Sequence, residues 1–169
     1  LCQGSITMDE HTIHCYNDTV HGQEDFYGAF ASSCNCAFAD MGVKLGGASL
    51  KDTAEDLLFN KKLPLATYKS STFSLDKNSV TPLVMQTAIG QGNTLVSPVH
   101  MALITCSIAN GGVLMEPRLI DQVVSTDGTL VRETEARAYK RLMTDNEAAV
   151  LGKLMENVVN YGTASALSG

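Results

Sequence analysis

A chain of 169 residues is long enough for one domain with its own hydrophobic core, and 44% hydrophobic with 18% charged residues excludes a disordered chain. The net charge is −6 and no cluster of Lys and Arg exceeds a pair, which excludes a typical nucleic-acid-binding surface. No apolar run reaches the roughly 18 residues that a bilayer-spanning helix needs, and no signal-peptide pattern opens the sequence. Because the first residue is Leu1 rather than Met, we expect an excised piece of a longer protein.

The first forty residues predict a hairpin followed by a helix. Short β-like segments at 5–8 and 12–16 flank the polar pair at 9–10, which is typical of two strands joined by a turn. Apolar residues then recur at helical spacing over about 24–40, so a helix is predicted there. Ser and Asn at 32–35 compete with helix hydrogen bonds, and a break at that point is the alternative to one continuous helix.

Residues 41–81 predict a second helix and a loop. Ser49 is followed by Asp52 three residues later, in the manner of a capping box, so we expect a helix that begins at Ser49 and ends by Pro64. Residues 65–81 are polar, irregular and rich in Ser and Thr. They predict a surface loop.

The most apolar segment of the chain predicts a buried helix. Ser97 offers an N-cap hydroxyl, Pro98 suits the first helical turn, and the Gly pair at 111–112 supplies a left-handed stop. The residues between them leave no polar face, so we expect this helix to be buried on all sides. Cys106 is then a small buried hydrophobe and His100 a hydrogen-bonded core histidine.

The C-terminal third predicts a second hairpin and a final helix. Apolar residues alternate on either side of the Asp-Gly turn at 125–128, which indicates a hairpin over 118–133. Thr144 and Glu147 form a capping-box pattern before an amphipathic helix that Gly162 ends. These elements together predict a mostly helical α+β fold with two small hairpins.

One polar run breaks an otherwise apolar helical segment. Ser32-Ser33-Cys34-Asn35-Cys36 stands inside GAFASSCNCAFADMG, and such local rule-breaking often marks function. Taken alone, the run is explained by a kink or by a cap between two short helices. The one-residue gap between Cys34 and Cys36 would point their thiols to different faces of a helix, so we expect buried spectators rather than a redox pair.

Three blocks of sequence, in order, resemble the transpeptidase domain of penicillin-binding proteins. The first is HGQEDFYGAFASSCNCAFADMGVKLG, in which Ser33-Cys34-Asn35 matches the S-x-N motif of the family. The second is QTAIGQGNTLVSPVHMALITCSIANGG, similar to the family's long signature helix and its preceding turn. The third is EPRLIDQVVSTDGTLVRE, followed by the helix that ends NYGTASALSG. The resemblance covers nearly the whole chain.

The resemblance implies the fold of the serine DD-peptidases and β-lactamases, with 1–169 as a partial transpeptidase domain whose central sheet comes largely from outside this sequence. The family needs an S-x-x-K nucleophile, the S-x-N triplet and a K-T-G strand. No S-x-x-K stands upstream of the triplet, and no K-T-G occurs. We therefore expect this chain alone to be inactive. Without the sheet, its apolar helix faces should cause self-association.

The resemblance also implies roles and partners. In the intact enzyme a serine activated by a lysine attacks the D-Ala-D-Ala bond of a peptidoglycan stem peptide and forms an acyl-enzyme, and β-lactams acylate the same serine. Ser33 is implied to relay a proton toward the leaving group, Asn35 to donate its side-chain amide to the substrate, and Cys34 to point into the protein. No cofactor and no nucleic acid are implied. The parent protein is expected on the outer face of the bacterial cytoplasmic membrane, held by an N-terminal anchor.

Two other functions stay open. The chain is alternatively a non-catalytic binding or scaffold module whose resemblance is accidental. A third interpretation is a β-lactam sensor or a relative of the serine β-lactamases. The second block favours the transpeptidases over that relative.

The His and Cys residues near the N-terminus are the other candidate site. His11, His14, Cys15 and His21, with Cys2 nearby, are donor types that suit zinc. No C-x-x-C pair or matched H-x₃₋₅-H spacing accompanies them, so we expect surface and turn residues of a hairpin region and no bound metal. Cys2 and Cys15 flank the predicted hairpin and would pair as a disulfide only if the compartment is oxidising and the geometry allows it.

Overall fold

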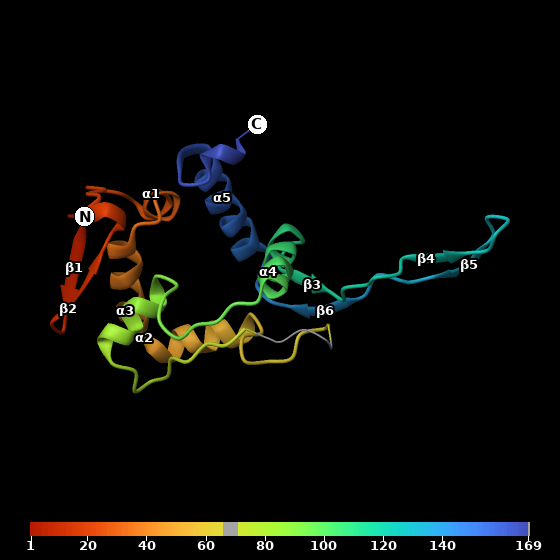
Figure 1. The fold of residues 1–169 in the computed structure, drawn as a ribbon, viewed down its shortest axis with the longest axis horizontal. Helices are drawn as coiled ribbons and strands as arrows, with labels where there is room; N and C mark the ends of the chain where they lie inside the picture. The colour runs from red at the N-terminus through yellow and green to blue at the C-terminus, as the bar shows by residue number, and fades with distance from the viewer. Residues whose placement is uncertain (66–70, 169) are drawn as a thin grey trace.

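The computed structural model describes residues 1–65 and 71–168, and Figure 1 shows their arrangement. Helices dominate, and the named strands form three separate antiparallel pairs. The fold class is therefore α+β and mostly helical, as predicted. The elements in chain order are β1 (Ser5–Met8), β2 (His11–His14), the 3-10 helix η1 (Tyr16–Asp18), α1 (Phe26–Ala31), α2 (Asn35–Asp56), α3 (Thr81–Ala88), α4 (Pro98–Ala109), β3 (Val113–Met115), β4 (Gln122–Val124), β5 (Leu130–Glu133), β6 (Ala138–Arg141), α5 (Asp145–Tyr161) and η2 (Ser165–Leu167).

The N-terminal hairpin is confirmed. β1 and β2 pair antiparallel, with Met8 opposite His11 at the closed end. Asp9 and Glu10 form the two-residue turn with φ of 47° and 62°, which are the left-handed conformations that a tight hairpin turn requires. The hairpin packs against α2, so this small sheet covers one side of the N-terminal helices.

The helix predicted over 24–40 is two helices, because the chain breaks between α1 and α2. The prediction of a separate helix after the glycine pair is confirmed in outline, although this helical segment begins at Gly47, two residues before Ser49, and ends at Asp56. α2 passes through a kink at Gly46, whose φ is 80°, and Ser49 lies inside the helix. Gly47 packs so tightly against the carbonyl of Asp76 that a Cβ would not fit. The glycine pair therefore interrupts the helix at Gly46 and lets its second segment pack closely against Asp76.

A helix that the sequence analysis missed, α3, packs along α2. Its eight residues, with Pro82 in the first turn, are too few to show a repeating helical pattern. Met85 is fully buried in the contact, and Gly42 of α2 leaves no room for a Cβ beside Ala88. The close approach of two helix backbones, rather than an apolar stripe, positions this helix.

The surface-loop prediction for 65–81 is wrong at Ser71 and Leu75, which are each 1% exposed. The Ser71 hydroxyl lies within hydrogen-bond distance of His100 Nδ1, at 2.7 Å, and accepts from the Ser97 amide at 3.0 Å. It therefore binds two groups at the start of α4. Residues 66–70 of the predicted loop lie outside the described residues. At the far end, residue 81 already belongs to α3.

The prediction that α4 is buried on all sides is wrong. Leu103 and Ile104 are buried against neighbouring elements, but Met101 is 44% exposed and Cys106 is also exposed. α4 contacts α5 and β3, and its other face is uncovered within the described part of the chain. An apolar pattern indicates what a helix can bury, whereas burial itself depends on the neighbours that reach it.

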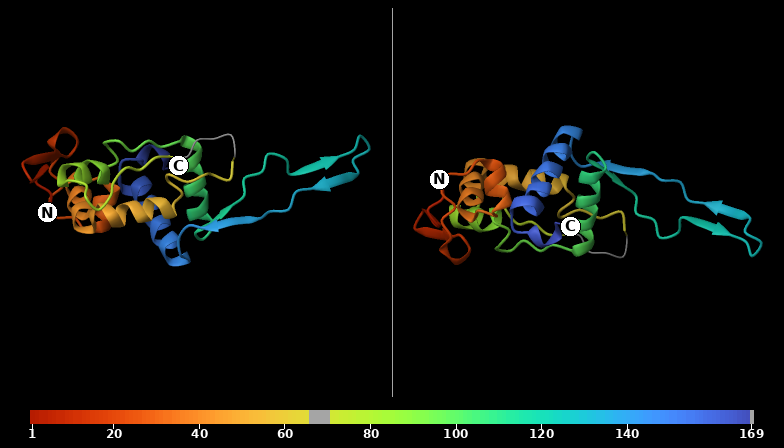
Figure 2. Two further views of the ribbon diagram at one scale, coloured as in Figure 1. Left: turned by 90° about the horizontal axis from the view of Figure 1, so that it is seen from below. Right: turned by 90° about the horizontal axis from the view of Figure 1, so that it is seen from above.

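The predicted C-terminal hairpin and final helix are confirmed, whereas the β3–β6 pair was not predicted. β4 and β5 pair around the turn at 125–128, and Figure 2 shows this hairpin extending away from the helices as an arm. β3 and β6 join the arm to α4 and α5. α5 begins with the predicted capping box: the Thr144 hydroxyl accepts from the Glu147 amide at 3.2 Å, and the Glu147 carboxylate accepts from the Thr144 amide at 2.7 Å. Each described helix is too short or too polar to span a bilayer.

Candidate functional site

The junction between α1 and α2 presents the S-x-N triplet. The Asp25 carboxylate caps α1 by accepting from the Gly28 amide at 2.8 Å, and the helix ends at Ala31. Ser33 then adopts a left-handed backbone with φ of 54°, and Cys34 is the N-cap residue of α2. A non-glycine residue in this region costs about 1–2 kcal/mol, and such strain often marks a functional position.

The two polar members of the triplet differ in how they are held. Ser33 is exposed, whereas Asn35 is partly buried at the first position of α2. The Asn35 side-chain amide donates to the His14 carbonyl at 2.9 Å, which fixes its orientation against β2. An amide group carries two N–H donors and a carbonyl acceptor, so Asn35 retains one N–H and its oxygen for a ligand.

The segment that follows α5 lies against the same junction. The Thr163 amide donates to the Ala31 carbonyl at 3.2 Å, and Gly162 packs so close to that carbonyl that a Cβ would not fit. Ala31 stands two residues before Ser33. The chain therefore brings the segment downstream of its last helix to the S-x-N turn, although about 130 residues separate the two in sequence.

The start of α4 packs at the opposite end of α2 from this corner. His100, fully buried near the start of α4, contacts the Leu57 carbonyl through Nε2 at 2.7 Å and the Ser71 hydroxyl through Nδ1 at 2.7 Å. Leu57 caps the C-terminal end of α2, whereas Ser33 precedes its N-terminal end. The start of α4 therefore reaches the site through α2, and α4 also contacts α5, which packs against α1. His100 is a hydrogen-bonded core histidine, as predicted.

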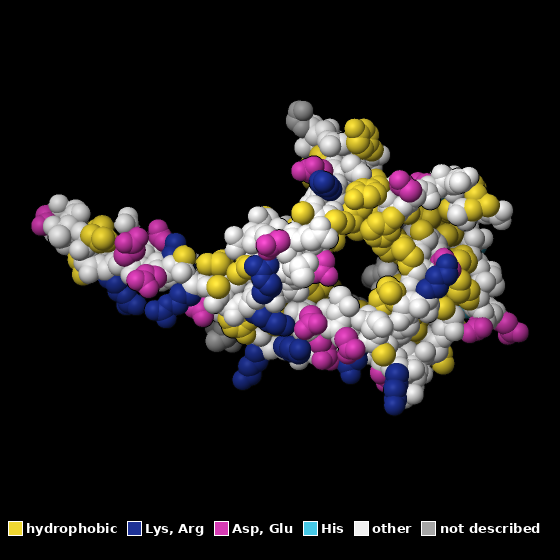
Figure 3. Space-filling view, turned by 180° about the vertical axis from the view of Figure 1, so that it is seen from behind, with side chains coloured by type: hydrophobic (Ala, Val, Ile, Leu, Met, Phe, Trp, Pro, Cys, Tyr) yellow, Lys and Arg dark blue, Asp and Glu magenta, His cyan; other side chains and the backbone are white. Residues whose placement is uncertain are grey.

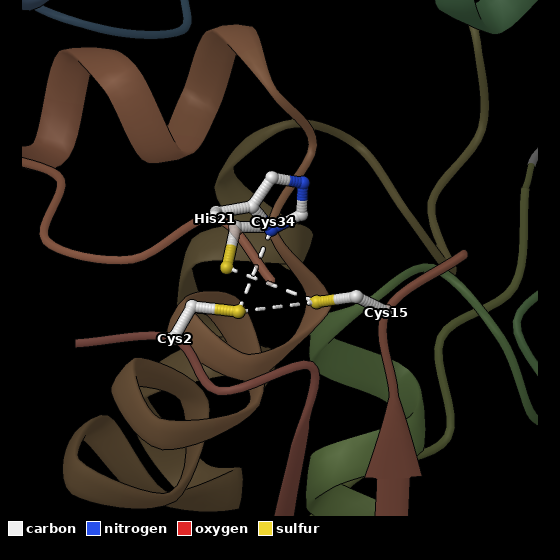
Figure 4. Close-up of side chains that lie close together, drawn as sticks. All are labelled: Cys2, Cys15, His21 and Cys34. Carbon is white, nitrogen blue, oxygen red and sulfur yellow. Dashed lines mark hydrogen bonds between the residues drawn. The ribbon is translucent and has the colours of Figure 1, made fainter. Parts of the chain in front are cut away.

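A second constellation lies directly behind the triplet. Figure 4 shows the thiols of Cys2, Cys15 and Cys34 and the ring of His21 pointing toward one another. The Cys2 and Cys15 Sγ atoms are 3.6 Å apart, Cys15 and Cys34 are 3.9 Å apart, and Cys2 Sγ lies 3.5 Å from His21 Nδ1. Cys36 Sγ lies 3.5 Å from Cys15 Sγ. All five described cysteines are free thiols.

This cluster corrects two predictions and agrees with a third. Cys2 and Cys15 are 5% and 3% exposed, so they are not surface residues. Cys34 and Cys36 do not point apart, because Cys34 precedes the helix as its N-cap and both thiols face Cys15. Cys34 does point into the protein, as expected, and is 1% exposed. Short-range spacing could not reveal the cluster, since its members come from four separate segments.

The thiols of the cluster differ in their tendency to ionise. Burial opposes ionisation of Cys2, but hydrogen bonds from backbone groups of His21 and Gly4 outweigh it and lower the pKa of Cys2 to about 6. Burial raises the pKa of Cys34 to about 12 and also raises the pKa of Cys36. One thiolate is therefore easily formed in this pocket without a cation, and further ionisation is opposed by burial and by the first charge.

A match to S-x-x-K that the sequence analysis overlooked, Ser74-Leu75-Asp76-Lys77, does not supply the missing nucleophile. The four residues are not helical, whereas an S-x-x-K pair needs one helical turn to bring its Lys beside its Ser. Asp76 packs against Gly47, twelve residues along α2 from Asn35. The match therefore lies beyond the Gly46 kink, whereas the triplet stands at the start of α2.

A cavity of about 320 Å³ lies on the opposite side of the cysteine cluster. It is bordered by the N-terminal segment, α1 and the start of α2, and Glu24, Asp25 and Asp40 line it together with Cys2 and Cys34. Ser33 and Asn35 do not line this cavity. The S-x-N pair therefore does not open into this cavity.

Comparison with known proteins identifies similar domains. The family model described as "Penicillin binding protein transpeptidase domain" matches residues 2–168. The peptidoglycan D,D-transpeptidase PbpA of Mycobacterium tuberculosis is 28% identical over 130 residues, which are 75% of this chain and 26% of that protein. Stage V sporulation protein D of Bacillus subtilis is 25% identical over 166 residues, which are 95% of this chain and 25% of that protein. The chain spans about a quarter of the length of these curated relatives.

Solved structures share the fold. The D,D-transpeptidase domain of a peptidoglycan glycosyltransferase from Eggerthella lenta superposes with a TM-score of 0.85 at 23% identity, covering 98% of this chain and 44% of that one. Penicillin-binding protein A of Mycobacterium tuberculosis, solved as an imipenem acyl-enzyme complex, superposes with a TM-score of 0.81 at 24% identity, covering 94% and 38%. At these identities the structures establish the fold of the chain, which is the fold that the sequence resemblance implied.

Proposed function

This chain belongs to the penicillin-binding protein transpeptidase family, and we propose that it forms the helical part of a peptidoglycan D,D-transpeptidase domain. That domain would cross-link stem peptides through a serine acyl-enzyme and would react with β-lactams at the same serine. The observation that supports this most directly is the exposed Ser33 at a left-handed turn, with the segment after α5 held beside it through Ala31. The S-x-N turn and the segment that follows α5 thus meet at one corner.

Ser33 and Asn35 would divide the work of the site. The Ser33 hydroxyl can both donate and accept a hydrogen bond, so it can pass a proton from the nucleophile pair to the departing amine. Asn35 would hold the substrate backbone with its free N–H, while its other N–H stays on the His14 carbonyl. Neither residue forms the covalent bond. The nucleophile and its lysine must come from elsewhere in the parent protein.

The proposal therefore includes that these 169 residues alone do not form an acyl-enzyme. They contain no Ser-Lys pair on a helix upstream of the triplet and no K-T-G. Incubation of this chain with a fluorescent penicillin should leave it unlabelled on a denaturing gel, whereas the full-length protein should become labelled. Covalent labelling of the 169-residue chain would contradict this part of the proposal.

Substitutions in the full-length protein test the roles of the two residues. Ser33→Ala should slow acylation by fluorescent penicillin about 10²- to 10⁴-fold, the usual contribution of a positioned proton-transfer group. Asn35→Ala should also slow it, with a weaker apparent affinity for substrate. Ser32→Ala is the matched control, because the Ser32 hydroxyl donates to the Glu24 carboxylate at 3.2 Å and not to the proposed substrate position. Equal acylation rates in the Ser33 and Ser32 variants would refute the assignment.

We also propose that the isolated chain self-associates. Figure 3 shows hydrophobic side chains around a hollow between α5 and the N-terminal helices. Phe26, Met155 and Tyr161 are 46%, 38% and 84% exposed, and a mainly apolar cavity of about 410 Å³ separates α4 from α5. Apolar surface of this kind is usually covered by another surface. Sedimentation of a strictly monomeric species at high concentration would contradict this.

The location of the parent protein follows from the proposed substrate. Peptidoglycan stem peptides lie outside the bacterial cytoplasmic membrane, so a domain that cross-links them would work on that face, held by an anchor elsewhere in the parent. Accessibility of the domain to an externally added protease in spheroplasts would support this location. Complete protection would contradict it.

A further inference from the structure

Four potential metal donors from four segments meet behind the S-x-N turn. Cys2 precedes β1, Cys15 follows β2, His21 lies in the connection to α1, and Cys34 caps α2. One ligand atom from each lies within 4.8 Å of all the others. Cys2, Cys15 and Cys34 are buried and His21 is partly buried, so the donors are largely shielded from solvent.

The spacing of these atoms fits a tetrahedral site. With Zn–S bonds of about 2.3 Å, two sulfur ligands of a tetrahedron lie about 3.8 Å apart. The Cys2–Cys15 and Cys15–Cys34 separations are 3.6 and 3.9 Å. With a Zn–N bond of about 2.0–2.1 Å, sulfur and nitrogen lie about 3.5 Å apart, which matches the 3.5 Å between Cys2 Sγ and His21 Nδ1.

Backbone hydrogen bonds hold the segments of the cluster together in the arrangement that a metal site needs. Cys2 and Gly22 exchange two backbone hydrogen bonds of 2.7 and 3.0 Å, which hold the segments of Cys2 and His21 side by side. The Cys15 amide donates to the Gly4 carbonyl at 2.8 Å, and the Gly4 amide approaches Cys2 Sγ at 3.4 Å. N–H groups aimed at sulfur stabilise a thiolate and are the usual outer contacts of a cysteine-bound metal.

We propose that Cys2, Cys15, His21 and Cys34 bind one Zn²⁺ as a closed structural site. Three thiols and one imidazole form a donor set that favours Zn²⁺ over the hard cations Mg²⁺ and Ca²⁺, and four protein ligands leave no open position for catalysis. On binding, each thiol that is still protonated releases its proton to solvent, and the histidine coordinates in its neutral form through Nδ1. The three thiolates and the cation leave a net charge of −1, so the metal removes the repulsion that otherwise opposes ionising the buried thiols.

The competing chemistry is disulfide formation. Cys2 and Cys15 are close enough for a bond after a small movement, and Cys15 and Cys36 are equally close. Either bond would consume Cys15 and leave a buried thiol pair with no role for His21. The metal site uses all four donors at once, which is why the observed arrangement favours it.

The site has a consequence for the neighbouring triplet, and this consequence rests on the proposed function. Cys34 is the middle residue of Ser33-Cys34-Asn35, so a metal bond to Cys34 would fix the left-handed turn from behind. It would also tie that turn to the β1–β2 hairpin, to which Asn35 is already bonded through His14. Metal loss should therefore loosen the turn that presents Ser33.

Metal analysis of the full-length protein tests the proposal. Purified without chelator and under non-oxidising conditions, it should contain about one Zn²⁺ per chain that depends on the cluster. Cys15→Ser, Cys34→Ser and His21→Ala should each lose most of that zinc. After removal of zinc, Co²⁺ should give the intense visible absorption of a tetrahedral site and a thiolate-to-cobalt charge-transfer band. These readouts need no enzyme activity.

Matched variants keep the test decisive. Cys106→Ser, on the exposed face of α4, and His14→Ala, in the hairpin but outside the cluster, should retain the zinc. Cys36→Ser should also retain it. Unmodified protein that lacks zinc, carries a Cys2–Cys15 disulfide or gives no tetrahedral Co²⁺ spectrum would overturn the proposal, and so would zinc that persists in the Cys34 and His21 variants. Because the zinc content and Co²⁺ spectrum of the unmodified protein do not depend on any variant, they test the proposal even where a variant does not fold.

The two proposals fail separately. Zinc bound to the Ser33→Ala variant with undiminished acylation would refute the proposed function and leave the metal site standing. If the protein contains no zinc but its acylation still slows in the Ser33→Ala variant, the metal site is refuted and the proposed function stands.

Discussion

The α1–α2 junction and the β4–β5 arm are stabilised in opposite ways. At the junction, segments far apart in sequence share buried contacts: four cysteine thiols, the Asn35 bond to β2 and the Thr163 bond to α1. The arm is exposed along both strands and is held by contacts within about fifteen residues, such as the 2.7 Å ion pair of Arg118 and Asp121. The stability of the junction depends on contacts between distant segments of the chain, whereas the stability of the arm depends on contacts around its own turn. Substitutions should therefore separate the two regions.

The largest difference should appear when a large side chain is truncated in the packed helical part, to which the junction belongs, and in the arm. Leu154, on α5, is 1% exposed, so Leu154→Ala should lower the free energy of unfolding by about 2–5 kcal/mol through lost burial and a cavity. Leu130, in the arm, is 52% exposed, and Leu130→Ala should change it by less than about 0.5 kcal/mol. Urea denaturation of the protein that carries this chain measures both. Similar losses would mean that the arm is packed against something in solution.

The contact that brings the end of α5 to the junction should be nearly as sensitive. A Cβ at Gly162 would collide with the Ala31 carbonyl, so Gly162→Ala should cost about 1–3 kcal/mol and expose the Thr163 amide to hydrogen exchange. Gly152→Ala is the control, because its Cβ would meet open space inside α5. That change should raise stability by about 0.5–1 kcal/mol. Unchanged protection at Thr163 in the Gly162 variant would argue against the contact.

The start of α5 should show an intermediate effect. Thr144→Ala removes the hydroxyl that accepts from the Glu147 amide, and the expected loss of stability is about 1 kcal/mol. Thr144→Ser keeps the cap and should be close to neutral. Denaturant midpoints of the two variants check this. A loss in the Ser variant equal to that in the Ala variant would point to packing of the methyl group and not to the cap.

The smallest effect should be a local one at the tip of the arm. Hydrogen bonds from the Ser125 hydroxyl and the Thr129 amide lower the pKa of Asp127 to about 2. Because the pKa is depressed in the folded turn, its stabilisation is present above the ordinary Asp value near 3.9 and is lost as the pH falls through about 2. NMR shifts of the turn amides should change in that window. In Asp127→Asn the change should vanish, and its persistence would assign the titration to another group.

The same contrast explains which features the sequence could predict. The Asp-Gly turn and the Thr144 capping box each depend on residues that are close together in the sequence, and both were confirmed. The cysteine cluster needs Cys2, Cys15, His21 and Cys34 to be brought together by the hairpin and two helices, and no short spacing encodes that. Ser33 was identified through its triplet and its family resemblance, but its left-handed backbone was not foreseen. α3 was missed because it is a single short helix set by one close contact at Gly42.

The left-handed backbone of Ser33 places two demands on one position. Glycine is the residue best suited to a φ of 54°, and Ser33→Gly would relieve about 1–2 kcal/mol of strain. The same change would delete the hydroxyl that the proposed reaction needs. A selection for thermal robustness alone would therefore be expected to enrich the glycine variant, while a selection for the proposed transpeptidation would remove it. This turn is a place where durability and activity compete for a single side chain.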